Sequence, residues 1–172
     1  MESNIQPESY HGVFVSIANK GILIIGAPGI GKSSLALELL YQGHQLIADD
    51  SVDVVAIDGQ LIGRCPPLLE KVIYSRELGL ISIPAIFGDF AWQQEHSLDY
   101  VVKLQPQHPE QLTFSQSDKQ YTIANVQLPL LILNTLNPAS LSHRLLCWRH
   151  MQSQQADAES QFIKRQQKMM SL

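Results

Sequence analysis

Residues 21–34 read Gly21-Ile22-Leu23-Ile24-Ile25-Gly26-Ala27-Pro28-Gly29-Ile30-Gly31-Lys32-Ser33-Ser34, and this stretch decides the fold. The short, apolar, β-branched run over residues 22–25 predicts a buried strand. The strand leads into Gly-x-x-x-x-Gly-Lys-Ser, the spacing of a phosphate-binding loop, or P-loop. Leu35 and Leu39 follow at helical spacing, and Gly43 stands where a helix ends. Strand, loop and helix together predict an α/β nucleotide-binding domain.

The loop has the residue types that phosphate binding requires. Glycines let backbone N–H groups turn towards a phosphate, and the start of the helix adds the positive end of its dipole. Lys32 supplies a mobile cation for the outer phosphates of ATP, and the Ser33 hydroxyl can bind Mg²⁺. The expected phosphate-binding residues are Gly26, Ala27, Pro28, Gly29, Ile30, Gly31, Lys32, Ser33 and Ser34. The alternative is an ordinary Gly/Pro-rich turn with a solvated lysine, and the flanking strand and helix argue against it.

Length and composition indicate one globular domain. The chain has 172 residues, 45% of them apolar, and a formal net charge of −4, which argues against broad binding of nucleic acid. No signal pattern and no membrane-length apolar run is seen, so we expect a cytoplasmic protein without a membrane partner. Cys65 and Cys147 are far apart and predict buried free thiols rather than a disulfide or a zinc site.

The rest of the chain predicts a single domain over residues 1–172, with a core over about 10–135 and a C-terminal helix over about 140–170. Residues 1–10 are polar and read as a loose lead-in. Alternation predicts a strand over 13–17 with one buried face, and a hairpin turning at Asp58-Gly59. Further strands are expected over 46–48, 99–104 and, in one or two pieces bent by Pro129, 121–133, with a polar connection over 105–119.

Asp49 and Asp50 follow the apolar strand over 46–48. Ligands of open α/β sheets bind at the carboxyl ends of strands, so the acids lie beside the phosphates if their strand is the parallel neighbour of the one before the loop. One carboxylate would then help to bind Mg²⁺, and the other would take a proton from an incoming hydroxyl. The alternative is a polar strand end or a helix cap.

Three further residues are open to two interpretations. His11, at the edge of a strand, is either a structural hydrogen-bonding residue or part of the site. Arg76 and Glu77 precede an apolar strand, and they are either a surface pair or face the γ-phosphate.

The joint pattern of these motifs resembles the C-terminal catalytic domain of the HPr serine kinase/phosphorylase family. It comprises His11-Gly12, the loop, Gly43-His44-x-Leu46-Ile47-Ala48-Asp49-Asp50-x-Val52-Asp53-Val54, Pro66-Pro67 and Arg76-x-Leu78-Gly79-Leu80-Ile81-x-Ile83. The resemblance covers Tyr10 to about Gly88 and fades beyond it. It suggests a short form that has the catalytic domain without the family's N-terminal domain.

The resemblance implies a role for each matching residue. His11 matches the active-site histidine, Lys32 the phosphate-binding lysine, and Ser33 the Mg²⁺-binding hydroxyl. Asp50 matches the aspartate that deprotonates the substrate serine and protonates the phosphoserine in the reverse reaction, with Asp49 beside it. Family members act on HPr, a small phosphocarrier protein of the sugar phosphotransferase system, use inorganic phosphate in the reverse reaction, and assemble as hexamers. The implied cofactors are ATP and Mg²⁺, and the implied partners are an HPr-type phosphocarrier and further copies of the chain.

Three departures separate the chain from the family pattern. Tyr74 stands where the family has a metal-binding Glu, and a neutral phenol is a poor ligand for a hard dication. Glu77 stands where the family has Gly, and it is the candidate replacement, which gives Ser33, Asp49 and Glu77 as expected metal ligands. The basic C-terminal segment used in dephosphorylation has no clear match, and residues 128–131 stand where it would begin.

The sequence therefore predicts an α/β P-loop domain with a mixed sheet and a C-terminal helix, which transfers the γ-phosphoryl group of ATP to a serine hydroxyl. The expected catalytic residues are His11, Lys32, Asp49, Asp50 and Arg76. Two other functions remain open. One is a nucleotide-sensing regulatory module with weak or no catalysis, and the other is a kinase of a small-molecule hydroxyl.

Overall fold

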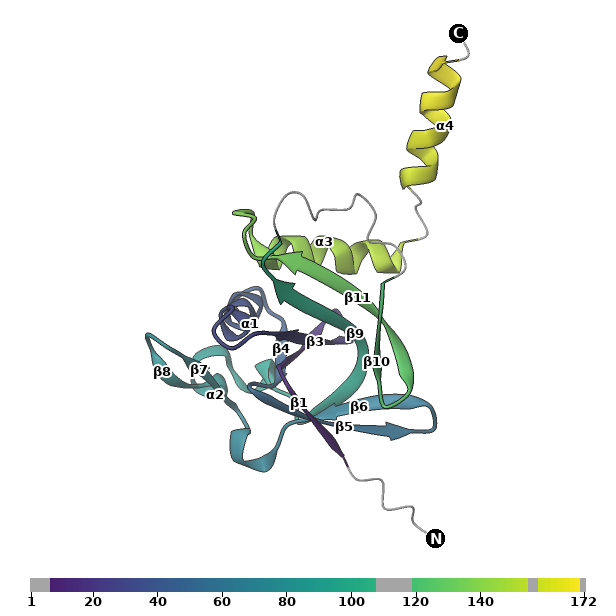
Figure 1. Cartoon of the computed structure of the whole chain (residues 1–172). Helices are drawn as coiled ribbons and strands as arrows, with labels where there is room; N and C mark the ends of the chain where they lie inside the picture. Colours follow the sequence, from purple (N-terminus) through teal and green to yellow (C-terminus); the bar gives the residue numbers. More distant parts are fainter. Residues whose placement is uncertain (1–6, 108–118, 155–157, 171–172) are drawn as a thin grey trace.

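The computed structural model describes residues 7–107, 119–154 and 158–170. Figure 1 shows a curved sheet with α1 and α3 beside it, while α4 extends away from the body. In chain order the elements are β1 (Glu8–His11), β2 (Val13–Ile17), β3 (Lys20–Gly26), α1 (Lys32–Tyr41), β4 (Gln45–Ala48), β5 (Ser51–Ile57), β6 (Gln60–Arg64), η1 (Pro67–Leu69), β7 (Val72–Ser75), β8 (Gly79–Ser82), α2 (Ile83–Phe87), η2 (Asp89–Ala91), β9 (Glu95–Gln105), β10 (Gln120–Ile123), β11 (Val126–Asn134), α3 (Leu141–Ser153) and α4 (Ala158–Met170).

The main sheet is mixed, as expected. Its strand order is β1-β5-β6-β9-β3-β2-β4, and β11 pairs with both β9 and β10. Strand β9 runs parallel to β3 and to β11, whereas β2 is antiparallel to both β3 and β4. Strands β7 and β8 form a separate two-stranded sheet. The α/β fold with a mixed sheet is confirmed.

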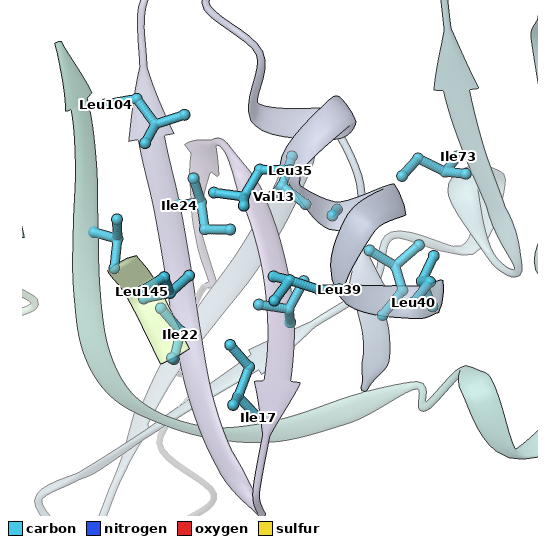
Figure 2. Close-up of a cluster of buried hydrophobic side chains, with 14 of the residues drawn as sticks. Val13, Ile17, Ile22, Ile24, Leu35, Leu39, Leu40, Ile73, Leu104 and Leu145 are labelled. Carbon is cyan, nitrogen blue, oxygen red and sulfur yellow. The ribbon is translucent and has the colours of Figure 1, made fainter. Parts of the chain in front are cut away.

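The central strands are buried on both faces of the sheet. Figure 2 shows the first cluster, in which Ile22 and Ile24 of β3 lie among Leu35 and Leu39 of α1 and Leu145 of α3. A second cluster, on the side of β5 and β6, contains Phe14 and Leu23. All five residues of β2 are consequently buried. The expectation of one buried face for residues 13–17 is wrong, because the second cluster covers the face that alternation assigned to solvent.

The segment that decides the fold has the predicted structure. Strand β3 contains the apolar run over 22–25, and α1 begins at Lys32, directly after the glycine-rich loop. Leu35 and Leu39 are buried, and Gly43 follows the helix with φ of 85°. The P-loop is therefore held between a central strand and a helix that packs on the core.

Other local predictions have mixed outcomes. The hairpin turning at Asp58-Gly59 is confirmed as β5 and β6. Residues 8–11 form β1 and pair with β5, so the loose lead-in is wrong for this part of the chain, and residues 1–6 lie outside the described residues. Residues 108–118 of the expected polar connection also lie outside them.

The strands expected over 99–104 and 121–133 are present. The 99–104 prediction is the second half of β9, and 121–133 holds β10 and β11. Pro129 does not interrupt β11. It lies where β11 changes partner from β10 to β9, because residues 126–129 pair with β10 and residues 130–134 pair with β9.

The C-terminal region is two helices rather than the single expected helix. Ser140 caps α3 by accepting a hydrogen bond from the His143 N–H at 3.2 Å. Helix α3 ends at Ser153, and the backbone of its C-cap residue Gln154 is extended (φ −109°, ψ 133°). Helix α4 begins at Ala158 and has no buried residue. Of α3 and α4, only α3 has a leucine, Leu145, in the core, whereas no residue of α4 is buried.

The two cysteines differ in environment. Cys65 is buried, and burial raises the pKa of its thiol to about 12. Cys147 is exposed, so the prediction of two buried thiols is wrong for it, because α3 turns Leu145 rather than Cys147 towards the core. In the described part of the chain no helix has the length and apolar character needed to span a membrane.

Candidate active site

The lysine of the loop is folded back onto the loop itself. Lys32 Nζ donates hydrogen bonds to the Gly26 carbonyl at 2.9 Å and to the Ala27 carbonyl at 3.1 Å. Burial lowers the pKa of the Lys32 ammonium, and the carboxylates of Asp50 and Asp49 oppose this shift. The ammonium therefore lies at the loop, between its carbonyls and two acids, where an incoming phosphate would meet it.

Asp49 links the loop to a distant part of the chain. Its Oδ1 accepts a hydrogen bond from the Ser33 hydroxyl at 2.8 Å, and its Oδ2 accepts one from the Tyr74 backbone N–H at 2.9 Å. The residue is buried, and both carboxylate oxygens are used. Asp49 thus fixes the start of α1 against strand β7, whose side chains form one wall of the site.

The acids reach the loop by a different route from the one expected. Strand β4 is not the neighbour of β3, because β2 lies between them and is antiparallel to both. Strands β3 and β4 still run in the same direction, so their carboxyl ends meet at one edge of the sheet. The expectation of neighbouring strands is wrong, but the acids lie beside the loop.

Asp50 is held in an unusual backbone conformation. Its φ of 69° lies in the left-handed region, where few residues other than glycine are found. Its carbonyl accepts a hydrogen bond from the Gly12 N–H at 3.1 Å. A Cβ at Gly12 would lie 2.7 Å from the Ile24 carbonyl oxygen, so the glycine permits the backbone at this position to lie close to β3. Strained backbone of this kind is frequent at functional sites.

The Asp50 side chain faces solvent and His11. The His11 Nδ1 lies 3.3 Å from Asp50 Oδ1, and both side chains are more than half exposed. His11 ends strand β1 and pairs in register with Ser51, which explains why a residue distant in sequence meets the acid pair. Asp50 is therefore accessible to an incoming group, in contrast to buried Asp49.

Arg76 brings a second cation to the loop. A Cβ added at Gly29, whose φ is 77°, would lie 2.5 Å from Arg76 Nη2, so the guanidinium rests directly over this glycine. Arg76 lies in the turn between β7 and β8, and Glu77 follows it. Both side chains line the cavity at the loop, so they are more than a remote surface pair.

These groups surround one cavity of about 500 Å³. It is lined by His11, Val13, Pro28, Gly29, Gly31, Lys32, Ser33, Ser34, Asp49, Asp50, Tyr74, Ser75, Arg76 and Glu77. Three of the expected phosphate-binding residues are not in its lining. The carbonyls of Gly26 and Ala27 bind Lys32 instead, and Ile30 packs against the core.

The donors of the site suit a magnesium ion that is held largely by phosphates. Among the described residues, no group of three or more His, Cys, Asp or Glu side chains is arranged to hold a metal. Mg²⁺ in nucleotide sites usually binds one or two carboxylates and otherwise waters and phosphates, so Ser33 with Asp49 is a sufficient protein contribution. Glu77 lines the same cavity with an exposed side chain.

Sequence reasoning missed part of the wall of the cavity. Val13 and Ser75 line it, and the Tyr74 N–H donates a hydrogen bond to Asp49, whereas the sequence marks Tyr74 only as a departure from the metal-binding pattern. No local motif marks these contacts, because they depend on how the β7–β8 hairpin folds back over the loop. The Arg76-x-Leu78-Gly79 pattern carries part of the family resemblance and marks Arg76, but it does not predict a hairpin.

The fold and the site define an α/β domain in which a loop with the P-loop spacing and an acid pair lie at one edge of a mixed sheet. The model of the HPr Serine kinase C-terminal domain family matches residues 4–166, and the chain belongs to this family.

Named relatives agree with this assignment. An HPr kinase/phosphorylase of Cupriavidus metallidurans is 45% identical over 112 residues, which cover 64% of this chain and 35% of that protein. The HPr kinase/phosphorylase of Ralstonia pickettii is 43% identical with the same coverage. The chain thus spans about a third of the length of the curated relatives it matches. The solved structure of the Hpr(Ser) kinase/phosphatase from Coxiella burnetii has a TM-score of 0.74 at 28% identity, covering 85% of this chain and 97% of that chain.

Proposed function

We propose that this chain is a serine kinase domain that binds ATP with Mg²⁺ in the 500 Å³ cavity and phosphorylates a small phosphocarrier protein of the HPr type. One observation carries the proposal: the P-loop lysine and an exposed acid, Asp50, line the same cavity. Family membership supports the nucleotide, and the names of the relatives support the acceptor.

Binding of ATP would begin with Lys32. Its ammonium exchanges the Gly26 and Ala27 carbonyls for the β- and γ-phosphate oxygens, which are stronger acceptors because they are charged. The Ser33 hydroxyl donates a hydrogen bond to Asp49, which leaves the lone pairs of the Ser33 oxygen free for a metal ion. Mg²⁺, when bound, neutralises charge on the β- and γ-phosphates. Arg76, over Gly29, adds a second cation on the open side of the loop.

Transfer would then need one proton acceptor. The serine oxygen of the acceptor attacks the γ-phosphorus, the bond from phosphorus to the β,γ-bridging oxygen breaks, and ADP leaves. Asp50 takes the proton of the serine hydroxyl, and His11 orients the Asp50 carboxylate through its contact at 3.3 Å. The residues of the chain thus contribute by positioning and by charge neutralisation, as in other phosphoryl transfers.

The direct test is incubation of the purified protein with γ-labelled ATP, Mg²⁺ and an HPr-type phosphocarrier. We expect acid-stable phosphate on a serine of the carrier, and none with Lys32→Ala protein. A carrier that stays unlabelled although the protein binds ATP would contradict the kinase proposal.

A second candidate function is a nucleotide-sensing module with weak or no catalysis. Tyr74 favours it, because a neutral, exposed phenol stands where the family pattern has a metal-binding carboxylate. This function predicts ATP binding that changes the affinity for a partner protein, without labelling of that partner.

The hexamer and the single-domain organisation expected from the sequence stay predictions. Sedimentation velocity measures the oligomeric state, and limited proteolysis tests the domain organisation.

A further inference from the structure

We call the 500 Å³ cavity at the P-loop the phosphate cavity. A second cavity, of about 260 Å³, opens beside it, and we call this one the side cavity. It is lined by Ser33, Asp49, Asp50, Leu69, Val72, Tyr74 and Leu80. Four of these residues, Ser33, Asp49, Asp50 and Tyr74, also line the phosphate cavity. The two cavities therefore adjoin at the acid pair, and a group that enters the side cavity lies next to the proposed proton acceptor.

The outer part of the side cavity is apolar and open to solvent. Leu69 comes from η1, Val72 and Tyr74 from β7, and Leu80 from β8. Tyr74 is 56% exposed and Leu80 is 70% exposed. Figure 1 shows the β7–β8 hairpin at the periphery of the molecule, away from the main sheet. Exposed apolar groups gathered at a hollow are typical of a binding surface.

The position of Ser33 shows which part of the reaction this cavity serves. The hydroxyl after the P-loop lysine binds the metal ion at the β- and γ-phosphates. The side cavity is therefore at the phosphate end of the nucleotide, where the acceptor hydroxyl must arrive. The adenine base lies at the opposite end of the nucleotide. Its volume also falls below the roughly 300–1,000 Å³ typical of pockets that enclose a whole small ligand.

We propose that the side cavity receives an apolar side chain of the acceptor polypeptide, from a residue that flanks the phosphorylated serine. This inference rests on the proposed kinase function. Consecutive Cα atoms of the acceptor are about 3.8 Å apart, so a residue near the serine reaches the side cavity while the serine faces Asp50. The cavity has no cationic residue in its lining and two aspartates at its inner end, so an acidic flanking residue would be rejected.

The hairpin offers a matched pair of variants. Leu80 lines the side cavity and is 70% exposed, whereas Leu78, on the same hairpin and 73% exposed, lines neither cavity. Leu80→Gln and Leu78→Gln each replace one exposed leucine, so neither change removes core packing. Melting temperatures equal to that of the wild type, measured by circular dichroism, would establish that both variants are folded.

Steady-state kinetics with ATP, Mg²⁺ and an HPr-type phosphocarrier tests the proposal. We expect Leu80→Gln to raise the KM for the carrier roughly tenfold, the scale of one lost apolar anchor, and to leave the KM for ATP unchanged. Leu78→Gln should match the wild type in both. In a second series, the apolar residues that flank the carrier serine are replaced by Ala, one at a time. One of these carrier variants should raise the KM for the carrier in the wild-type kinase. The same carrier variant should not raise this KM further in Leu80→Gln.

The other outcomes overturn the proposal in distinguishable ways. Equal KM values for the carrier in Leu80→Gln and Leu78→Gln, with wild-type transfer intact, would reject the side cavity as a docking site and leave the kinase function standing. A raised KM for ATP alone would assign the cavity to the nucleotide. Absence of transfer by the wild type would overturn the proposed function and this inference together.

Discussion

The two segments that flank the phosphate cavity are built in opposite ways. The P-loop joins β3 to α1, and its neighbours Ile22, Ile24 and Leu35 are at most 1% exposed. The β7–β8 hairpin is a separate two-stranded sheet, with Leu78 and Leu80 largely exposed. From this difference we propose that the two segments have different roles. The P-loop, which the core fixes in place, would hold the phosphates, and the exposed hairpin would contact the acceptor.

The hairpin is nevertheless tied to the loop. Ile73 and Ile83, at its two ends, are fully buried, and the Tyr74 N–H reaches Asp49, which also binds Ser33. Changes on the loop should therefore affect nucleotide binding. Changes at exposed hairpin positions that line one of the two cavities should affect metal use or acceptor binding and leave the fold intact.

The largest effect is expected for the loop lysine. Lys32→Ala removes the cation that would bind the outer phosphates, and hydrogen bonds to charged groups contribute about 1.5–3 kcal/mol. We expect ATP affinity, measured by isothermal titration calorimetry, to fall roughly 10- to 100-fold. Lys164→Ala, which removes a lysine from exposed helix α4, is the control and should bind ATP normally. Unchanged affinity in Lys32→Ala would place the nucleotide elsewhere.

A smaller effect is expected on the hairpin side, at Tyr74 and Glu77. Tyr74→Glu keeps the backbone N–H that binds Asp49 and adds an ionised oxygen, which Mg²⁺ prefers to a phenol. We expect the kinase rate to rise and to saturate at lower Mg²⁺, as measured in a magnesium titration. If Glu77 already contributes to the metal site, Glu77→Ala should instead raise the Mg²⁺ requirement.

The pair of variants separates the two candidate functions. Loss of activity in Glu77→Ala would mean that the carboxylate has moved along the hairpin and that the site is catalytic. No response to either variant would mean that this side of the cavity does not hold metal, which favours the nucleotide-sensing function.

The smallest effect concerns stability and involves His44, which lies outside both segments, between α1 and β4. Burial and the nearby His150 lower the pKa of His44 below its ordinary 6.5. The folded protein thus favours neutral His44, and the unfolded chain takes up the proton first as the pH falls. The contribution of neutral His44 to the free energy of unfolding is complete above the pKa of this residue in the unfolded chain. It is lost as the pH drops through and below 6.5.

Thermal unfolding across this pH range is the corresponding measurement. The melting temperature of the wild type should fall more steeply on acidification than that of His44→Gln. His143→Gln, an exposed histidine of α3, should behave like the wild type. Identical slopes for the wild type and His44→Gln would show that His44 does not titrate differently on folding.

The two flanking segments also differed in how well sequence predicted them. The P-loop, α1 and the end at Gly43 are local, since each depends on residues within a few positions, and all were predicted. The acid pair was expected at the loop, but by way of neighbouring strands. The insertion of β2 between β3 and β4 depends on hydrogen bonds between strands, which alternation of apolar residues does not specify.

The hairpin side could not be predicted to the same depth. The hydrogen bond from the Tyr74 N–H to Asp49 joins a backbone group to a side chain 25 residues away. Because any residue other than proline has this N–H, the sequence does not predict the contact. The side cavity likewise depends on how η1 and the hairpin fold against the acids. At the other end of the chain, the break at Gln154 carries no Gly or Pro, so one continuous helix was the natural prediction.

The most direct test of the account compares Asp50→Asn with the wild type under single-turnover conditions, with protein loaded with ATP and Mg²⁺ and mixed with an HPr-type phosphocarrier. An amide keeps the shape of Asp50 but cannot accept a proton, so we predict normal ATP affinity and no transfer to the serine. Asp49→Asn should instead weaken Mg²⁺-dependent ATP binding, because Asp49 binds Ser33. Transfer by Asp50→Asn at the wild-type rate would contradict the central claim that Asp50 is the proton acceptor.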